Sequence, residues 1–131
     1  MTALEFREHT TDSADGWTAA CEYDFLIPNR GVAVLLPGGE QVALFRLDDG
    51  TLHAVGNMDP FAGAAVMSRG IVGDRKGVTV VASPLLKQAF SLETGQCLDD
   101  ETKSLPVYEV RVSNGTVYIR PGDSRLLNKV T

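Results

Sequence analysis

Two loop-like segments decide how this sequence is read. The first, Asn57–Gly70, is NMDPFAGAAVMSRG, and the second, Ala82–Gly95, is ASPLLKQAFSLETG. Each carries a proline after a small polar residue, a combination that is typical of turns. Between them lie two short apolar runs, residues 70–73 and 77–83, joined through the polar residues 74–76. The runs predict a strand pair, so the local pattern is a loop, two strands and a second loop.

Strand signals also dominate the chain before these loops. The runs 31–37 (GVAVLLP) and 41–47 (QVALFRL) flank a Gly-Gly-Glu turn and predict a hairpin. A further turn at Asp48-Asp49-Gly50 leads into TLHAV at 51–55, and residues 17–21 are expected to open the sheet. The amino-terminal part therefore reads as a meander of short strands.

The carboxyl-terminal part gives the clearest hairpin. The runs 107–112 (VYEVRV) and 116–120 (TVYIR) are joined by Ser-Asn-Gly, and an Asn-Gly pair supplies the positive φ angles that a tight hairpin requires. Alternation places Tyr108, Val110 and Val112 on one face. The earlier run 88–98 predicts a strand, a turn and a short continuation.

No segment shows a sustained helical period, and at most a helical turn is expected at 21–26 and at 99–105. Several short strands at spacings of about 8 to 12 residues are typical of an antiparallel sandwich or a small barrel. We predict an all-β fold with little helix. The expected boundaries are a polar leader at 1–16, one β domain at 17–120 and a polar tail at 121–131.

Composition restricts the function. The 131 residues carry 12 Lys and Arg against 17 Asp and Glu, a net charge of −5. This acidity argues against a nucleic-acid partner and against an anionic membrane surface. No apolar run reaches the ~20 residues of a membrane helix, and the first 16 residues do not read as a secretory signal. With two cysteines 76 positions apart, Cys21 and Cys97, the expected setting is the cytoplasm, although the sequence alone leaves a disulfide open.

The order of strands and loops resembles the Rieske domain. In that family two loops hold a [2Fe–2S] cluster, with two Cys on one iron and two His on the other. The loop scaffold is matched here by Asn57, Pro60, Gly63 and Ala64, by Pro84, Phe90, Leu92, Thr94 and Gly95, and by Leu105–Tyr108. The resemblance places Asp59 and Phe61 at the ligand positions of the first loop, and Ser83 and Leu86 at those of the second.

These four residues are a poor ligand set, because Phe and Leu have no donor atom and Asp and Ser offer hard oxygens. We expect no metal, no cofactor and no catalytic residue in this chain. The total of two Cys and two His matches a Rieske centre only by coincidence, because Cys21, Cys97, His9 and His53 are scattered.

The ligand positions carry structural expectations instead. Phe61 and Leu86 are expected to pack on each other in the vacated space. Asp59 and Ser83 are expected to support the loops by accepting hydrogen bonds from nearby amides. The loop tips are either stable turns or an apolar contact surface for a partner, and Met67 is a further candidate for that surface. The candidate contact residues are Met58, Pro60, Phe61, Pro84, Leu85 and Leu86.

A narrower resemblance follows from the stretches 21–46, 57–74 and 81–100. They are similar to the small subunit of bacterial assimilatory NAD(P)H-dependent nitrite reductase, over about residues 17 to 120. The resemblance implies a large-subunit partner that carries FAD, sirohaem and a [4Fe–4S] cluster and reduces nitrite to ammonium. This chain would then be an accessory subunit of an enzyme of the EC 1.7.1.4 type.

The sequence suggests three other interpretations. A Rieske-type electron carrier shares the fold but needs the missing ligands. A hydrolase built on Ser83, His53 and Asp59 lacks any sign of an activated serine. A stand-alone protein-interaction module with another partner stays open, because a fold does not fix a function. The small basic cluster of Arg69, Arg75 and Lys76 reads either as a solvated hairpin or as a rim contact to an acidic partner.

Overall fold

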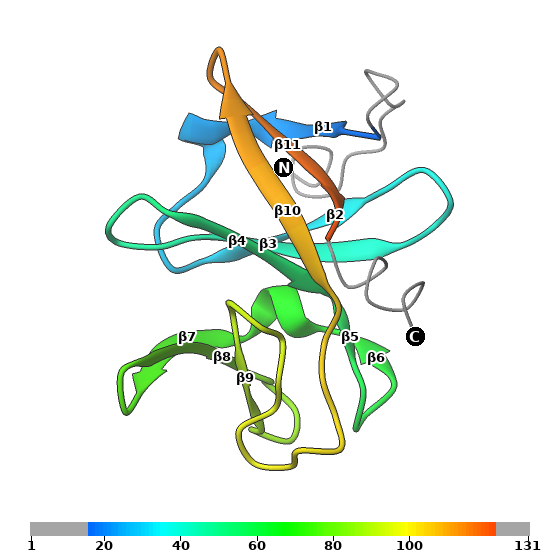
Figure 1. Cartoon of the computed structure of the whole chain (residues 1–131), viewed down its shortest axis with the longest axis vertical. Helices are drawn as coiled ribbons and strands as arrows, with labels where there is room; N and C mark the ends of the chain where they lie inside the picture. Colours follow the sequence, from blue (N-terminus) through cyan, green and yellow to red (C-terminus); the bar gives the residue numbers. More distant parts are fainter. Residues whose placement is uncertain (1–15, 123–131) are drawn as a thin grey trace.

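The computed structural model describes residues 16–122, which form three antiparallel sheets and two single-turn 3-10 helices (Figure 1). The predicted leader 1–16 and tail 121–131 lie almost wholly outside this range. The elements are β1 (Thr18–Glu22), η1 (Tyr23–Phe25), β2 (Gly31–Leu35), β3 (Gln41–Arg46), β4 (Leu52–Gly56), β5 (Met58–Asp59), β6 (Ala64–Ala65), η2 (Met67–Arg69), β7 (Ile71–Arg75), β8 (Val78–Ala82), β9 (Ala89–Ser91), β10 (Val107–Ser113) and β11 (Thr116–Pro121).

The main sheet has six strands in the order β1-β11-β10-β4-β3-β2 and curls toward a barrel. Its hairpins form where the turn residues permit them. Asn114 and Gly115 adopt φ angles of 52° and 81° between β10 and β11, as a tight turn requires. The predicted all-β fold and its strand pairs are confirmed.

Strand β3 explains how the barrel supports the loops. Its residues 42–45 are all buried. Val42 and Leu44 point into the barrel core, whereas Ala43 and Phe45 belong to a second cluster on the other face. Side chains alternate across a strand, so a strand covered on both faces needs a continuous apolar run. The sequence VALF meets that requirement.

The second cluster lies between the barrel and the two smaller sheets. Figure 1 shows β7, β8 and β9, together with the β5–β6 hairpin, gathered at one end of the molecule. Val55 from the barrel packs in this cluster with Val81 and Phe90 from the smaller sheet. Both sequence-predicted loops therefore start from buried strands at the same end.

Several details differ from the sequence predictions. Of the two segments expected to hold at most a helical turn, 21–26 contains η1, whereas 99–105 contains turns and an isolated bridge at Ser104. The short elements β5, β6 and η2 were not predicted. Strand β11 extends to Pro121, one residue past the expected boundary. Val112 shares a face with Tyr108 but is 45% exposed, because burial fades toward the tip of its hairpin.

Within residues 16–122, no helix has the length and apolarity to cross a membrane.

Candidate functional site

A buried hydrogen bond joins the two loops. The hydroxyl of Ser83 donates to Oδ2 of Asp59 over 2.5 Å. Asp59 is fully buried and Ser83 is 1% exposed. The hydrogen bond gives each of these two buried polar side chains a partner in the other loop. The two positions that the Rieske resemblance assigns to cysteine ligands therefore contact each other directly.

The same two side chains also organise their own loops. Oδ1 of Asp59 accepts hydrogen bonds from the amides of Phe61 (2.8 Å) and Ala62 (3.2 Å). Oγ of Ser83 accepts one from the amide of Leu85 (3.2 Å). The carboxylate thus has three donors, which compensate for its removal from water. The prediction that these residues support the loops by binding amides is confirmed, and the bond between them is an addition to it.

Phe61 fills space near the loops, but with a different partner from the one expected. Its ring packs at a tilt of 48° against Phe90, with centroids 6.2 Å apart. The ammonium of Lys103 lies 5.8 Å from the same ring. Leu86 is 50% exposed, so the prediction that it packs with Phe61 in a vacated interior is wrong. Strand β9 supplies the aromatic partner instead.

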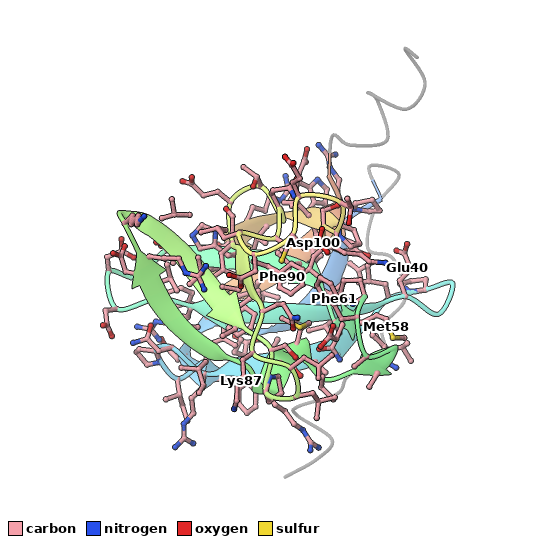
Figure 2. All side chains as sticks on the ribbon, turned by 90° about the horizontal axis from the view of Figure 1, so that it is seen from below. Glu40, Met58, Phe61, Lys87, Phe90 and Asp100 are labelled. Carbon is pink, nitrogen blue, oxygen red and sulfur yellow. The ribbon has the colours of Figure 1, made fainter. Side chains whose placement is uncertain are left out.

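The loop tips expose apolar side chains. Met58, Leu85 and Leu86 are 54%, 51% and 50% exposed. Pro60, Phe61 and Pro84 are partly buried. Figure 2 views this end of the molecule and places Phe61 beside Phe90 near the centre, with Met58 toward one side and Lys87 toward the rim. Met67 is fully buried in the second cluster, so its candidacy for the surface was wrong.

Asn57 fixes the start of the first loop, a role that sequence reasoning did not assign. Its side chain is 2% exposed. Oδ1 accepts a hydrogen bond from the amide of Ser68 (2.7 Å), and Nδ2 donates to Oε1 of Gln41 (3.2 Å) and to the carbonyl of Ala65 (3.4 Å). An asparagine directly after a buried strand and before a long turn was the available signal.

A salt bridge fixes the strands behind the second loop. Arg75 in β7 binds Asp99 over 2.8 Å, and Oδ2 of Asp99 accepts the amide hydrogen of Ala89 at the start of β9. The hydrogen bond from Arg75 lowers the pKa of Asp99 below its ordinary value. Of the basic cluster noted in the sequence, Arg75 is therefore structural.

The residues do not fit a [2Fe–2S] cluster. Asp59 and Ser83 are committed to each other and to amides, Phe61 has an aromatic partner, and Leu86 has no donor atom. Cys21 and Cys97 form no disulfide and are buried in different hydrophobic clusters, and His53 lies in β4 opposite Phe45. His9 lies outside the described residues. Among residues 16–122, no group of three His, Cys, Asp or Glu side chains is placed to hold a metal ion.

The arrangement does not support a serine hydrolase either. Ser83 is buried and gives its hydroxyl hydrogen to a carboxylate rather than to a histidine. A nucleophilic serine needs a base within hydrogen-bond reach and a path to the substrate. The site is a closed pair of loops with an apolar outer surface.

Comparison with known proteins identifies the relatives of this arrangement. The profile of the Rieske-like [2Fe-2S] domain family matches residues 16–120. A nitrite reductase (NADH) small subunit from Salmonella typhimurium is 44% identical over 105 residues, which are 79% of this chain and 96% of that protein. The chain belongs to the family of nitrite reductase small subunits.

A solved structure and a larger protein extend the comparison. A crystal structure from Mycobacterium tuberculosis, assigned as an NADH-dependent nitrite reductase small subunit, has 64% identity and a TM-score of 0.79, covering 81% of this chain and 95% of that one. The nitrite reductase [NAD(P)H] large subunit of Klebsiella oxytoca is 37% identical over 111 residues, 85% of this chain but 11% of that protein. A domain of this kind therefore also occurs inside a large subunit.

Proposed function

We propose that this chain is the small, non-catalytic accessory subunit of an assimilatory nitrite reductase that reduces nitrite to ammonium with NAD(P)H. It acts by docking to a large subunit that carries FAD, sirohaem and a [4Fe–4S] cluster. The relatives named as nitrite reductase small subunits support this assignment. The proposed setting is nitrate assimilation in the cytoplasm, without nucleic-acid or membrane partners.

The observation that carries the proposal is the bond between Asp59 and Ser83. It keeps the two loops together without any metal ligand, and the loops then present Met58, Leu85 and Leu86 to solvent. A domain built this way can position a partner, and we propose that it carries no group that accepts electrons. We therefore assign electron transfer to the cofactors of the large subunit, and we propose that this chain binds no [2Fe–2S] cluster.

The Klebsiella oxytoca protein supports a partner rather than an independent role. In that large subunit the matching segment is covalently attached to the rest of the enzyme. Fusion raises the effective concentration of one domain for another and is useful only where the two make contact. By analogy, the separate chain is proposed to occupy the same place through a non-covalent interface.

We propose the loop tips as the centre of that interface. Met58, Leu85 and Leu86 form its exposed apolar part, and Pro60, Phe61 and Pro84 form its partly buried base. Adjacent exposed apolar side chains are common at protein contacts. The two prolines restrict the backbone of both tips, which lowers the entropy lost when the surface is ordered on binding.

The test is recovery of the partner from the source cells. The tagged full chain is purified gently from nitrate-grown cells, and the eluate is assayed for sirohaem absorbance and for nitrite-dependent NAD(P)H oxidation. We expect both, together with one large protein. A chain that is recovered alone, or with a protein lacking sirohaem, contradicts the proposal and favours a separate interaction module.

A further inference from the structure

A second exposed surface lies beside the loop tips. It is formed by Ile27, Arg30, Arg69 and Ile71, which we call the arginine–isoleucine surface. Ile71 is 66% exposed and Ile27 is 56% exposed. These are the two highest values among the large hydrophobic side chains of residues 16–122. Both arginines are also exposed.

Turn geometry brings Arg30 and Arg69 to one hollow, with Ile27 and Ile71 close to them along the chain. The amide of Arg30 donates to the carbonyl of Ile27 over 3.0 Å, so these two residues flank one tight turn. Arg69 and Ile71 flank Gly70 at the entry to β7. The two segments border one surface hollow of about 350 Å³, lined by Asn29, Arg30, Gly31, Ser68, Arg69 and Gly70.

Close backbone packing holds the two segments in place. A Cβ atom on Gly31 would lie 2.5 Å from the carbonyl oxygen of Ser68 and 2.6 Å from the ring of Phe45. A Cβ atom on Gly70 would lie 2.6 Å from the carbonyl oxygen of Ala82. Each arginine therefore precedes a glycine whose missing side chain permits the contact. Because the backbone of both segments is already fixed by packing, it loses little conformational entropy when both guanidinium groups bind one target.

The charges of this surface are unbalanced. Among residues 16–122, neither Arg30 nor Arg69 forms an ion pair or a side-chain hydrogen bond, although the whole chain has a net charge of −5. A neighbouring hollow shares Asn29 and contains Asp48, Asp49 and Asp74, and the carboxylate of Asp48 accepts a hydrogen bond from the side chain of Asn29 over 2.9 Å. Two free guanidinium groups in an acidic protein are a complementary target for carboxylates, which arginine binds in a bidentate manner.

The surface is continuous with the loop tips. Ile71 pairs with Ala82, and Ala82 is followed directly by Ser83 and the exposed Leu85 and Leu86. Strand β7 is also the outer strand of its sheet. Because Ile71 is paired with a residue close to Leu85 and Leu86 along the chain, a partner that covers these leucines is placed to contact Ile71 and Arg69 as well.

We propose that the arginine–isoleucine surface receives an acidic segment of the large subunit, with its carboxylates on Arg30 and Arg69 and its apolar residues on Ile27 and Ile71. This inference rests on the proposed function, since it takes the large subunit as the partner. It adds a charged region to the interface and a dependence of binding on salt. Arginine is enriched at protein interfaces and among the residues that contribute most to binding free energy.

The experiment titrates purified large subunit with the full chain and measures Kd in 50 mM and 300 mM NaCl. The double variant Arg30→Gln/Arg69→Gln is expected to bind at least about tenfold more weakly at the lower salt, with a smaller difference at the higher salt. Arg30→Lys/Arg69→Lys keeps the charge but loses the planar fork, so an intermediate Kd is expected. Ile71→Ser is expected to weaken binding at both salts.

The matched control is Lys76→Gln, which removes one charge from the far end of the same hairpin and should leave Kd within about twofold. A Kd of the double arginine variant equal to that of the unmodified chain overturns the inference and leaves the proposed function intact. So does loss of binding caused only by loop-tip variants. Binding of inorganic phosphate to the free chain, or self-association lost with the arginines, also overturns it. No binding by the unmodified chain defeats the proposed function itself.

Discussion

Asp59 shows at the scale of one residue how a loop survives without a metal. A buried carboxylate is costly to desolvate unless its oxygens are hydrogen-bonded, and here a hydroxyl and two amides are bound to it. The hydroxyl comes from the other loop. The bond therefore satisfies a buried charge and joins two segments with one contact.

Replacing Ser83 with alanine is expected to lower the free energy of unfolding by about 1–3 kcal/mol, because a buried carboxylate loses its strongest donor. Urea unfolding at neutral pH measures the loss. Ser113→Ala is the matched control, since that serine is exposed near a hairpin tip and should change stability by less than about 0.5 kcal/mol. Equal stabilities of the two variants would show that the Asp59–Ser83 bond contributes little.

Tyr108 carries a prediction about alkaline pH. Burial, together with the charge and hydrogen bond of Glu40, raises the pKa of this phenol from 10.0 to about 12. Since the folded state holds the proton more tightly than the unfolded state, the contribution is full below pH 10 and is lost as the pH rises toward 12. Tyr108→Phe is expected to show a weaker fall in stability over this window, measured by urea midpoints at several pH values.

Glu40→Gln separates the two causes of the Tyr108 shift. Removing the carboxylate should lower the pKa of Tyr108 only in part, because burial is the larger cause. Ultraviolet absorbance of the phenolate follows the titration. A pKa that returns to the ordinary value in this variant would assign the shift to Glu40 alone.

Sequence reasoning at this scale found functions for side chains but not their distant partners. The hydrogen bonds that Asp59 and Ser83 accept from backbone amides follow from local turn chemistry and were predicted. The pairing of Phe61 with Phe90 joins residues from separate elements, and no local pattern encodes it. Met67 was misplaced for the same reason, since its burial depends on the barrel behind η2.

At the scale of elements, glycines show where one segment approaches another. Gly95 and Gly77 both adopt left-handed φ angles, +80° and +87°. A Cβ on Gly95 would clash with the carbonyl oxygen of Leu105, whereas a Cβ on Gly77 meets nothing within 4 Å. A substitution at Gly77 therefore measures the cost of backbone strain alone, whereas one at Gly95 adds the cost of a steric clash.

Gly77→Ala is expected to cost about 1–2 kcal/mol, the usual penalty for a left-handed residue with a side chain. Gly95→Ala should cost at least about 1–3 kcal/mol more, because the Leu105 segment must move. Thermal and urea unfolding of both variants provide the comparison. Similar losses would mean that the turn before Leu105 adapts readily.

Restoring the four ligand residues is expected to let the two loops bind an iron–sulfur cluster. Asp59→Cys/Phe61→His with Ser83→Cys/Leu86→His restores the paired Cys and His spacing of a Rieske centre. After treatment with iron and sulfide, this variant is expected to bind about one [2Fe–2S] cluster per chain, whereas the unmodified chain stays colourless. Visible absorbance and iron analysis measure the result. A cluster in the unmodified chain would contradict the proposed loss of the ligands.

Elements with strong patterns were predicted, and elements made by packing were not. The hairpins on either side of the Asn-Gly and Gly-Gly turns combine alternating apolar residues with turn residues that require positive φ. Strands β5 and β6 have two residues each, too few for a period to be visible. They exist because the Asn57 and Asp59 side chains hold the loop in place.

At the scale of the whole molecule, two buried hydrophobic clusters stabilise the fold, and the apolar side chains proposed for binding lie outside them. The barrel core lies under the six-stranded sheet, and the second cluster lies between β3 and the loop-bearing sheet. Exposed apolar side chains at the loop end project from a buried base. Substitutions at those tips should therefore change binding and leave the fold unchanged.

Met58→Ser/Leu85→Ser/Leu86→Ser is the variant that tests this separation. Each side chain is at least half exposed, so the thermal midpoint should fall by only a few degrees. For a domain near this size, a loss of 1 kcal/mol in unfolding free energy lowers the midpoint by about 4–8 °C. Affinity for the large subunit should fall by at least about tenfold, since loss of 1.4 kcal/mol is a factor of ten. Titration of the large subunit with the full chain gives the Kd.

Val112→Ser is the matched control for the loop-tip variant. Val112 is 45% exposed, but it lies near the tip of the β10–β11 hairpin, at the end of the molecule opposite the loops (Figure 1). Its substitution removes an exposed apolar side chain at one position rather than three and should leave Kd unchanged. If Val112→Ser weakens binding as much as the loop-tip variant does, the barrel end also contacts the large subunit, and the loops are not the centre of the interface.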